Sequence, residues 1–210
     1  MKKSLASWRN LRQQYPEIEL TLNMVAEEPD CSDQVADCFI TVDPPKQNFV
    51  SQFLYAERLY PVCGLKLWQQ LQDQPLPEAL WSQPLLSVEA IYPGKELGQD
   101  WRKWCESGGF KLPEEVKMNH FSHMLLAAEA AKYDQGITLI NHYLMTDQDR
   151  QHNFVRIPMH ELMTGDSFYF VYKKSRAKQT DIIKLSRWLK QQCYEQEQQY
   201  SEQQQQYNTQ

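Results

Sequence analysis

Polar side chains and a glycine occur at three places where strands are predicted to end or helices to begin. Residues 41–43 close an apolar strand, residues 119–123 precede an alanine-rich helix, and residues 135–137 carry a glycine before another apolar strand. N–H groups at a helix start have no intrahelical partner and, with the helix dipole, attract anionic groups. Glycine allows a backbone to approach a ligand closely. The candidate contacts to a small molecule are Thr41, Asp43, His120, Phe121, Ser122, Gly136 and Ile137.

Each of these polar residues also has a purely structural interpretation. Ser122 could simply cap the helix that follows it, and Thr41 could be a buried strand residue. Asp43 could hold an amino group of a ligand or repel an acidic one, or it could only stabilise the turn before Pro44. The sequence leaves these alternatives open.

Metal and catalytic chemistry have little support in the sequence. His120 and His123 are three residues apart and could share a helix face, but no further metal ligand lies near them. Asp147 and Asp149 could form a carboxylate pair, although a solvated helix face is the interpretation that we favour. No glycine-rich phosphate loop, G-x-S-x-G elbow or H-E-x-x-H motif occurs. We therefore expect neither an enzyme nor a bound cofactor or metal.

The charge pattern argues against strong nucleic-acid binding by this chain itself. Its 210 residues carry a formal net charge of -5, and lysine and arginine are interspersed with acidic residues. DNA-binding surfaces more often form a basic patch or stripe. A hydrophobic content of 41% is enough to fill the core of one large domain or of two lobes.

The five cysteines and the N-terminal sequence indicate a cytoplasmic protein. The odd number of cysteines and the lack of a C-x-x-C pair favour reduced, mostly buried thiols, with a redox switch between Cys31 and Cys38 as the alternative. No apolar stretch is long enough for a signal peptide or a membrane span.

Hydrophobic periodicity predicts alternating strands and helices, as in α/β folds. A half-exposed strand is expected at 18–24, and a strand covered on both faces at 38–42. Trp101 and Trp104 should pack in the core from one helix face. Further helices are expected at 4–15, 65–72, 100–107, 121–132 and 180–193, and further strands at 53–64, 85–88, 114–119, 136–140 and 167–174.

Several local sequences, in this order, resemble one family. They are LRQQYPEIELTL (11–22), DCFITVDPP (37–45), YAERLYPVCGLKL (55–67), PLLSVEAIY (84–92), DWRKWCESGG (100–109) and FSHMLLAAEAAKYDQGITLI (121–140). Together they resemble the effector-binding domain of LysR-type transcriptional regulators. The resemblance is strongest to the branch that includes regulators of glycine cleavage and of β-lactamase induction.

The resemblance implies an α/β fold of the type 2 periplasmic-binding-protein kind, with two α/β lobes and a central effector cleft. Lobe I would comprise residues 1–59 and 147–193, with its first strand missing, and lobe II residues 60–146. Residues 194–210 are rich in glutamine. They could prolong the last helix for a turn or two, and beyond that we expect a flexible tail. The family's helix-turn-helix domain is not recognisable in this chain.

The function implied by the resemblance is effector sensing for a transcriptional regulator. A small metabolite would bind between the lobes and change the geometry of a homodimer or homotetramer, and DNA would be bound only by the missing N-terminal domain. The first helix of one subunit would meet the alanine-rich helix of another, where Ala127 and Ala131 would allow close approach. The alternative is a stand-alone solute-binding protein of the same fold, which is disfavoured by the lack of an export signal.

Overall fold

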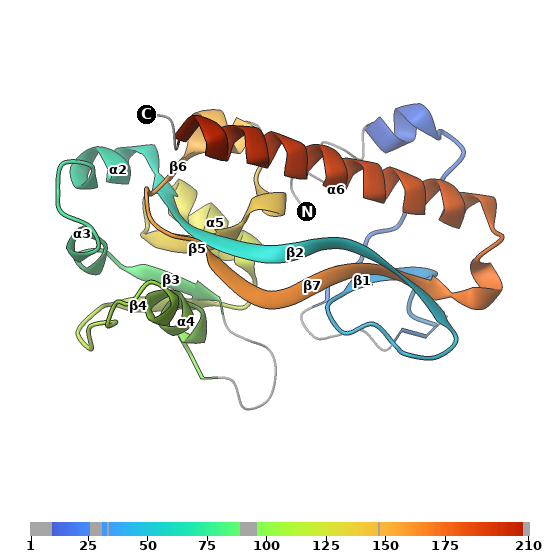
Figure 1. Ribbon diagram of the computed structural model, residues 1–210, viewed down its shortest axis with the longest axis horizontal. Helices are drawn as coiled ribbons and strands as arrows, with labels where there is room; N and C mark the ends of the chain where they lie inside the picture. The colour runs from blue at the N-terminus through green and yellow to red at the C-terminus, as the bar shows by residue number, and fades with distance from the viewer. Residues whose placement is uncertain (1–9, 26–30, 33, 89–95, 147, 208–210) are drawn as a thin grey trace. The chain divides into compact units, whose positions relative to one another are not determined.

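The chain folds into two compact units in the computed structural model, which describes residues 10–25, 31–32, 34–88, 96–146 and 148–207 (Figure 1). Unit 1 comprises Lys3–Glu57 and Gly165–Gln210, and unit 2 comprises Arg58–Thr164. The first boundary is close to the predicted one. The second lies at Gly165 rather than at residue 147, because a short strand after residue 153 still pairs within unit 2.

Unit 1 is built on three paired strands and a long helix. Strand β1 (Cys38–Thr41) pairs antiparallel with β7 (Leu162–Lys173), whose other neighbour is β2 (Phe49–Gly64). Both β2 and β7 continue into unit 2. The 3-10 helix η3 (Lys174–Arg176) leads from β7 to helix α6 (Thr180–Tyr207), drawn in red along these strands in Figure 1.

The core of unit 1 lies between α6 and the sheet. The residues Ile182, Leu185 and Leu189 recur at helical spacing and are all buried, as the periodicity predicted. Together with Trp188, the two leucines pack on Leu54 of β2 and Phe170 of β7. Burial of this apolar face holds α6 on the strands.

Of the two strands predicted early in unit 1, one does not form, and the other forms but is covered on one face only. Residues 18–25 carry the alternating pattern but form no strand, because a strand also needs a partner for its backbone hydrogen bonds. Strand β1 stands at the end of the sheet order, and Ile40 is 48% exposed between the buried Phe39 and Thr41. An apolar run thus formed an edge strand with one buried face. The predicted first helix is seen over residues 10–14, and its residues 4–9 lie outside the described part.

The glutamine-rich end of the chain also differs from the expectation. Helix α6 runs to Tyr207, so residues 194–207 are helical rather than a flexible tail. Tyr200 is only 5% exposed, which gives this stretch one buried apolar contact. Glutamine has a good helix propensity, so a helix that has already begun can propagate through such a sequence.

Unit 2 contains the parallel strands. The sheet order runs from β2 to β5 (Ile137–Asn141), β3 (Leu85–Val88) and β4 (Met118–Phe121), and β6 (Phe154–Arg156) also pairs with β2. β3 is parallel to both β4 and β5, whereas β2 is antiparallel to β5 and β6. The helical segments of unit 2 are α2 (Leu65–Leu71), α3 (Glu78–Trp81), α4 (Gln99–Ser107), α5 (Met124–Lys132), the 3-10 helix η1 (His142–Leu144) and the π-helix η2 (Asp149–Asn153).

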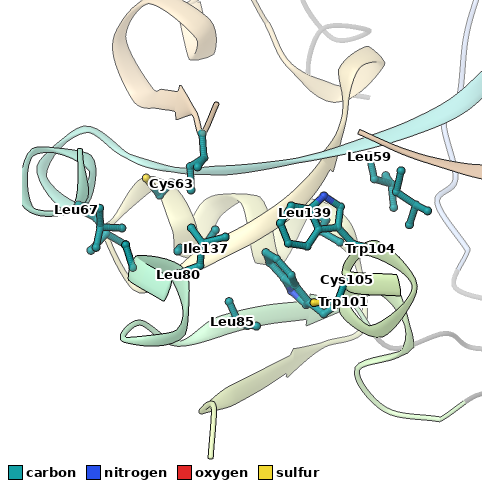
Figure 2. Packing of buried hydrophobic residues seen from close by; sticks show 14 residues of the cluster. Leu59, Cys63, Leu67, Leu80, Leu85, Trp101, Trp104, Cys105, Ile137 and Leu139 are labelled. Atoms are coloured by element: carbon teal, nitrogen blue, oxygen red, sulfur yellow. The ribbon is translucent and has the colours of Figure 1, made fainter. Parts of the chain in front are cut away.

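Apolar clusters cover both faces of the unit 2 sheet. One cluster joins Leu85 to Trp101 and Trp104 of α4, whose rings meet edge to face at 5.4 Å (Figure 2). The other joins the adjacent Leu86 to α5. Strands buried on both faces are continuous apolar runs, which explains the sequences LLSV and ITLI. The expected core position of the two tryptophans is confirmed, and the indole Nε1–H of Trp101 donates to the Leu86 carbonyl at 3.3 Å.

The small residues of α5 do not face outward. Ala127 and Ala131 are both fully buried and pack against the sheet, so the prediction that they form a contact surface for another subunit was wrong. The exposed apolar residues of this helix and its C-cap are Leu126, at 53%, and Tyr133, at 69%. Periodicity identified the helix, but the face that the sheet covers could be seen only in the folded unit.

Enlarging Ala131 should therefore destabilise unit 2. Ala131→Leu adds volume to a closed position, and overpacking of this kind costs about 1–3 kcal/mol. Leu97→Ala, at an exposed leucine of unit 2, should change the free energy of unfolding by less than about 0.5 kcal/mol. Urea unfolding followed by tryptophan fluorescence measures both, and an unaffected Ala131→Leu variant would show that Ala131 is not in the core.

Candidate ligand-binding site

Three parallel strands of unit 2 end at one edge of the sheet. Val88 of β3 is in register with Phe121 of β4, and the pairing of Leu86 with Thr138 puts Ile140 of β5 at the same level. The residues that follow β4 and β5, Ser122 and His142, therefore emerge at this edge. Ligands of open α/β sheets bind outside the carboxyl ends of parallel strands, so this edge is the candidate site.

Ser122 has its hydroxyl available at this edge. The side chain of His123, not that of Ser122, caps helix α5: the Leu125 N–H donates to His123 Nδ1 at 3.1 Å. Ser122 is exposed and forms no hydrogen bond within the part of the chain that the structure describes. The interpretation of Ser122 as a plain helix cap is thus not realised. Ser122 directly precedes the N-cap of α5, where the helix dipole is positive.

The cap on α5 depends on the protonation state of His123. An imidazole nitrogen that accepts an N–H must carry no proton, so the bond to Leu125 exists only for neutral His123. Burial lowers the pKa of His123 below its ordinary value. The neutral ring is therefore favoured in the folded unit. His123 acts there as a helix cap, whereas the sequence had also suggested it as a metal ligand.

A carboxylate stabilises the end of β3 at the same edge. Asp100 accepts hydrogen bonds from the Ser87 hydroxyl at 2.6 Å, the Val88 N–H at 3.0 Å and the Trp101 N–H at 2.9 Å. Burial raises the pKa of Asp100, and these hydrogen bonds oppose the rise. The side chain thus connects the end of β3 to the start of α4.

The turn after β5 adds polar groups that the sequence prediction missed. Asn141 is buried and its side-chain oxygen accepts the Tyr143 N–H at 3.0 Å, while His142 Nδ1 lies 3.5 Å from Arg150 Nη1. Three polar or aromatic residues directly after an apolar strand were the available signal. Only the parallel register of β5 with β3 shows that they share an edge with Ser122.

The sequence had suggested that Asp149 lies on a solvated helix face, but the structure shows it buried. Its side chain is only 4% exposed and accepts from Thr146 Oγ1 at 2.7 Å and from Asn153 Nδ2 at 2.8 Å. These bonds satisfy the buried carboxylate and fix the turn that leads into η2. Asp147, the other member of the predicted pair, lies outside the described residues.

Two predicted contacts lie at the opposite end of the strands. Ile137 begins β5 and is in register with Leu85, the first residue of β3. Gly136, with a φ of +149°, lies against the Pro84 carbonyl, which accepts the Ile137 N–H at 3.0 Å. The glycine does permit a close backbone approach, but to another strand, and Ile137 is fully buried. The structure does not bring these two residues together with Ser122.

The remaining candidates lie on β4 of unit 2 and at the end of β1 in unit 1. His120 is an exposed residue of β4, beside the half-buried Phe121. In unit 1, Thr41 is buried and its hydroxyl accepts the Asp43 N–H at 3.1 Å, which is the structural role considered for both residues. Asp43 itself is exposed. A ligand contact by Thr41 or Asp43 stays a prediction.

Potential metal ligands do not cluster in the described residues, and the cysteines are free thiols. Within the described residues, no three His, Cys, Asp or Glu side chains gather to hold a metal ion, and no helix is long and apolar enough to cross a membrane. All five cysteines are free thiols, Cys31 and Cys38 included. Burial raises the pKa of Cys38 and Cys105 to about 11, and of Cys63 and Cys193 to about 12, so they are protonated at neutral pH.

Comparison with known proteins gives one consistent family. The model of the LysR substrate binding domain matches residues 7–194. The glycine cleavage system transcriptional activator of Escherichia coli (strain K12) is 26% identical over 137 residues, which are 65% of this chain and 42% of that protein. The chain thus spans less than half the length of this curated relative.

The similar solved structures share the fold. The AmpR effector binding domain from Citrobacter freundii has a TM-score of 0.73 at 18% identity, with 92% of each chain covered. Full-length LysG from Corynebacterium glutamicum, with bound effector Arg, has a TM-score of 0.59 at 16% identity, with 92% of this chain and 66% of that chain covered. The predicted periplasmic-binding-protein-like α/β fold is confirmed.

Acidification should weaken the folded state through His123. Its folded pKa lies below the unfolded value of about 6.5, so below that pH the unfolded state binds more protons and stability falls. His123→Asn keeps a capping side chain that does not titrate. As the pH falls from about 7.5 to about 5, the free energy of unfolding of the native protein should therefore decrease relative to that of this variant.

Urea titrations across this pH range measure the difference, with His152→Asn, a change at an exposed histidine, as the matched control. A difference that stays constant with pH for His123→Asn would contradict the capping role.

Proposed function

Because the chain belongs to the LysR substrate-binding domain family, we propose that it senses a small metabolite for a bacterial transcriptional regulator. The observation that supports this most is the alignment of three parallel strand ends in unit 2. It places the Ser122 hydroxyl, the start of α5 and the polar turn after β5 at one edge. Such an edge can hold the anionic or hydroxyl groups of a small effector.

An effector acts on such a domain only through a difference in affinity between two conformations. A coupling of about 1–3 kcal/mol between effector and DNA binding corresponds to a change of about 5- to 150-fold in affinity. Ser122 lies between β4 and α5, so a ligand bound there would contact the start of α5. Binding at the edge could thereby bias the arrangement of subunits.

DNA contact belongs, in this proposal, to another part of the full regulator. The net charge of -5 does not suit a DNA-binding surface, and the E. coli relative is more than twice as long as the stretch that it shares with this chain. A regulator of transcription works beside the DNA, so we place the protein in the cytoplasm. No catalytic step is assigned to it.

The effector site can be tested by thermal shift. Amino acids, muropeptide fragments and small carboxylates are screened against the protein, and a specific ligand raises the melting temperature in a concentration-dependent way. Ser122→Ala should reduce the apparent affinity by about tenfold, which corresponds to one lost hydrogen bond of about 1.4 kcal/mol. Ser175→Ala, which removes another exposed serine hydroxyl, is the control and should not change it. An effector whose shift is equal in both variants would exclude Ser122 as a contact.

We also propose that α5 forms part of a homodimer or homotetramer interface, through Leu126 and Tyr133 rather than through its alanines. These two residues are seven apart, lie two helical turns from each other on one side, and are exposed by 53% and 69%. Contiguous exposed apolar patches mark interaction sites, and two large apolar side chains on one helix face would contribute to such a patch.

Sedimentation velocity at tens of micromolar tests the assembly. The native protein should sediment as a dimer or larger, and Leu126→Glu should shift it toward monomer, because a charge would be buried at the contact. Leu97→Glu, at a leucine of similar exposure (54%), should leave the assembly unchanged. A native protein that is strictly monomeric would rule out this interface.

A further inference from the structure

A cavity of about 460 Å³ lies in unit 2, between α4 and the segment that leads into β4. Its apolar lining is buried or half-buried and includes Cys105, Phe110, Val116 and Met118. A volume of about 300–1,000 Å³ with a mostly apolar lining is typical of small-molecule sites. We call this cavity the α4 pocket.

The walls of the α4 pocket are held in place by packing. The rings of Phe110 and Trp104 stack with their centroids 6.1 Å apart, and those of Trp104 and His160 stack with their centroids 4.4 Å apart. The Phe110 N–H donates to the Cys105 carbonyl at 2.8 Å. On the other side, Gly98 leaves room for the Met118 thioether, which a Cβ at that position would meet. A pocket with a fixed wall needs little ordering when a ligand binds.

Charged residues of both signs line the pocket where it opens to solvent. Arg102, Glu106, Lys111 and Glu114 are all exposed lining residues. Arg102 already donates to the Leu97 carbonyl at 2.7 Å. Within the described part of the chain, the side chains of Glu106, Lys111 and Glu114 have no ion-pair or hydrogen-bond partner, so both signs of charge remain open to a ligand.

The α4 pocket is separate from the strand ends. Met118 begins β4 and pairs with Leu85, the first residue of β3, whereas Phe121 and Ser122 follow at the other end of β4. Three residues of a strand span about 10 Å. A ligand in the pocket would therefore lie at the opposite edge of the sheet from Ser122.

We propose that the α4 pocket binds a small zwitterion with an apolar side chain, such as a free aliphatic amino acid. The side chain would contact Val116 and Met118, the carboxylate would bind Lys111, and the ammonium group would bind Glu106 or Glu114. Each charged contact is a charge-assisted hydrogen bond, which is stronger than a neutral one. The domain would then carry a second ligand site besides the edge proposed for the effector.

Methyl NMR of the methionines in the full chain tests this, with L-leucine as the probe. The Met118 signal is assigned from Met118→Leu, and leucine is titrated to about 10 mM, well above a millimolar dissociation constant. Two analogues each lack one charge: 4-methylpentanoate has no ammonium group and 3-methylbutylamine has no carboxylate. Lys111→Gln removes the proposed carboxylate contact, and Lys103→Gln is the matched control, an exposed lysine of α4 outside the pocket lining.

The Met118 signal should shift in a saturable way with leucine. Lys111→Gln and each analogue should weaken binding by about tenfold, which corresponds to one lost charged contact, and Lys103→Gln and Ser122→Ala should leave it unchanged. The absence of a saturable shift, or equal binding of leucine and both analogues, would overturn the proposal. So would loss of the shift in Ser122→Ala, because the ligand would then bind at the strand ends. The effector site of the proposed function is tested independently by its own thermal shift.

Discussion

The close approach of β5 to β3 sets the geometry of unit 2. The Ile137 N–H donates to the Pro84 carbonyl at 3.0 Å, and this contact is possible because residue 136 is glycine: a Cβ would overlap the Pro84 oxygen. The bond starts the parallel register in which Val88, Phe121 and Ile140 reach the same level. Apolar clusters on both faces then hold the sheet between α4 and α5. The position of every candidate contact in unit 2 follows from this register.

Buried and half-buried polar side chains organise the edge at which those strands end. Asp100 holds the end of β3, and His123 rather than Ser122 caps α5. Asp149 fixes the turn before η2 through Thr146 and Asn153. Because these residues satisfy the backbone and side-chain groups around them, Ser122 is left with a hydroxyl that serves no structural purpose. A ligand site needs both properties, a fixed surround and an uncommitted polar group.

Membership of the LysR substrate-binding domain family gives this geometry a context. The similar structures are effector domains and a full-length regulator with a bound effector, at identities that show the fold and not the ligand. The chemistry of the effector therefore has to come from the residues of this chain. They offer a serine hydroxyl just before a helix start at one edge of unit 2. The apolar pocket at the other edge, lined by charges of both signs, is separate from it.

The sequence by itself determined what depends on local patterns. Periodicity predicted α5 and the inward face of α6, continuous apolar runs predicted β3 and β5, and the order of motifs identified the family. Only the tertiary structure decided pairing and direction, because hydrogen-bond partners and covered faces come from residues far away in the chain. It left residues 18–25 without a strand, turned Ala127 and Ala131 into the core, and separated Gly136 from Ser122. The same non-local register brought Asn141 and His142 to the edge that Ser122 occupies, which no local pattern could show.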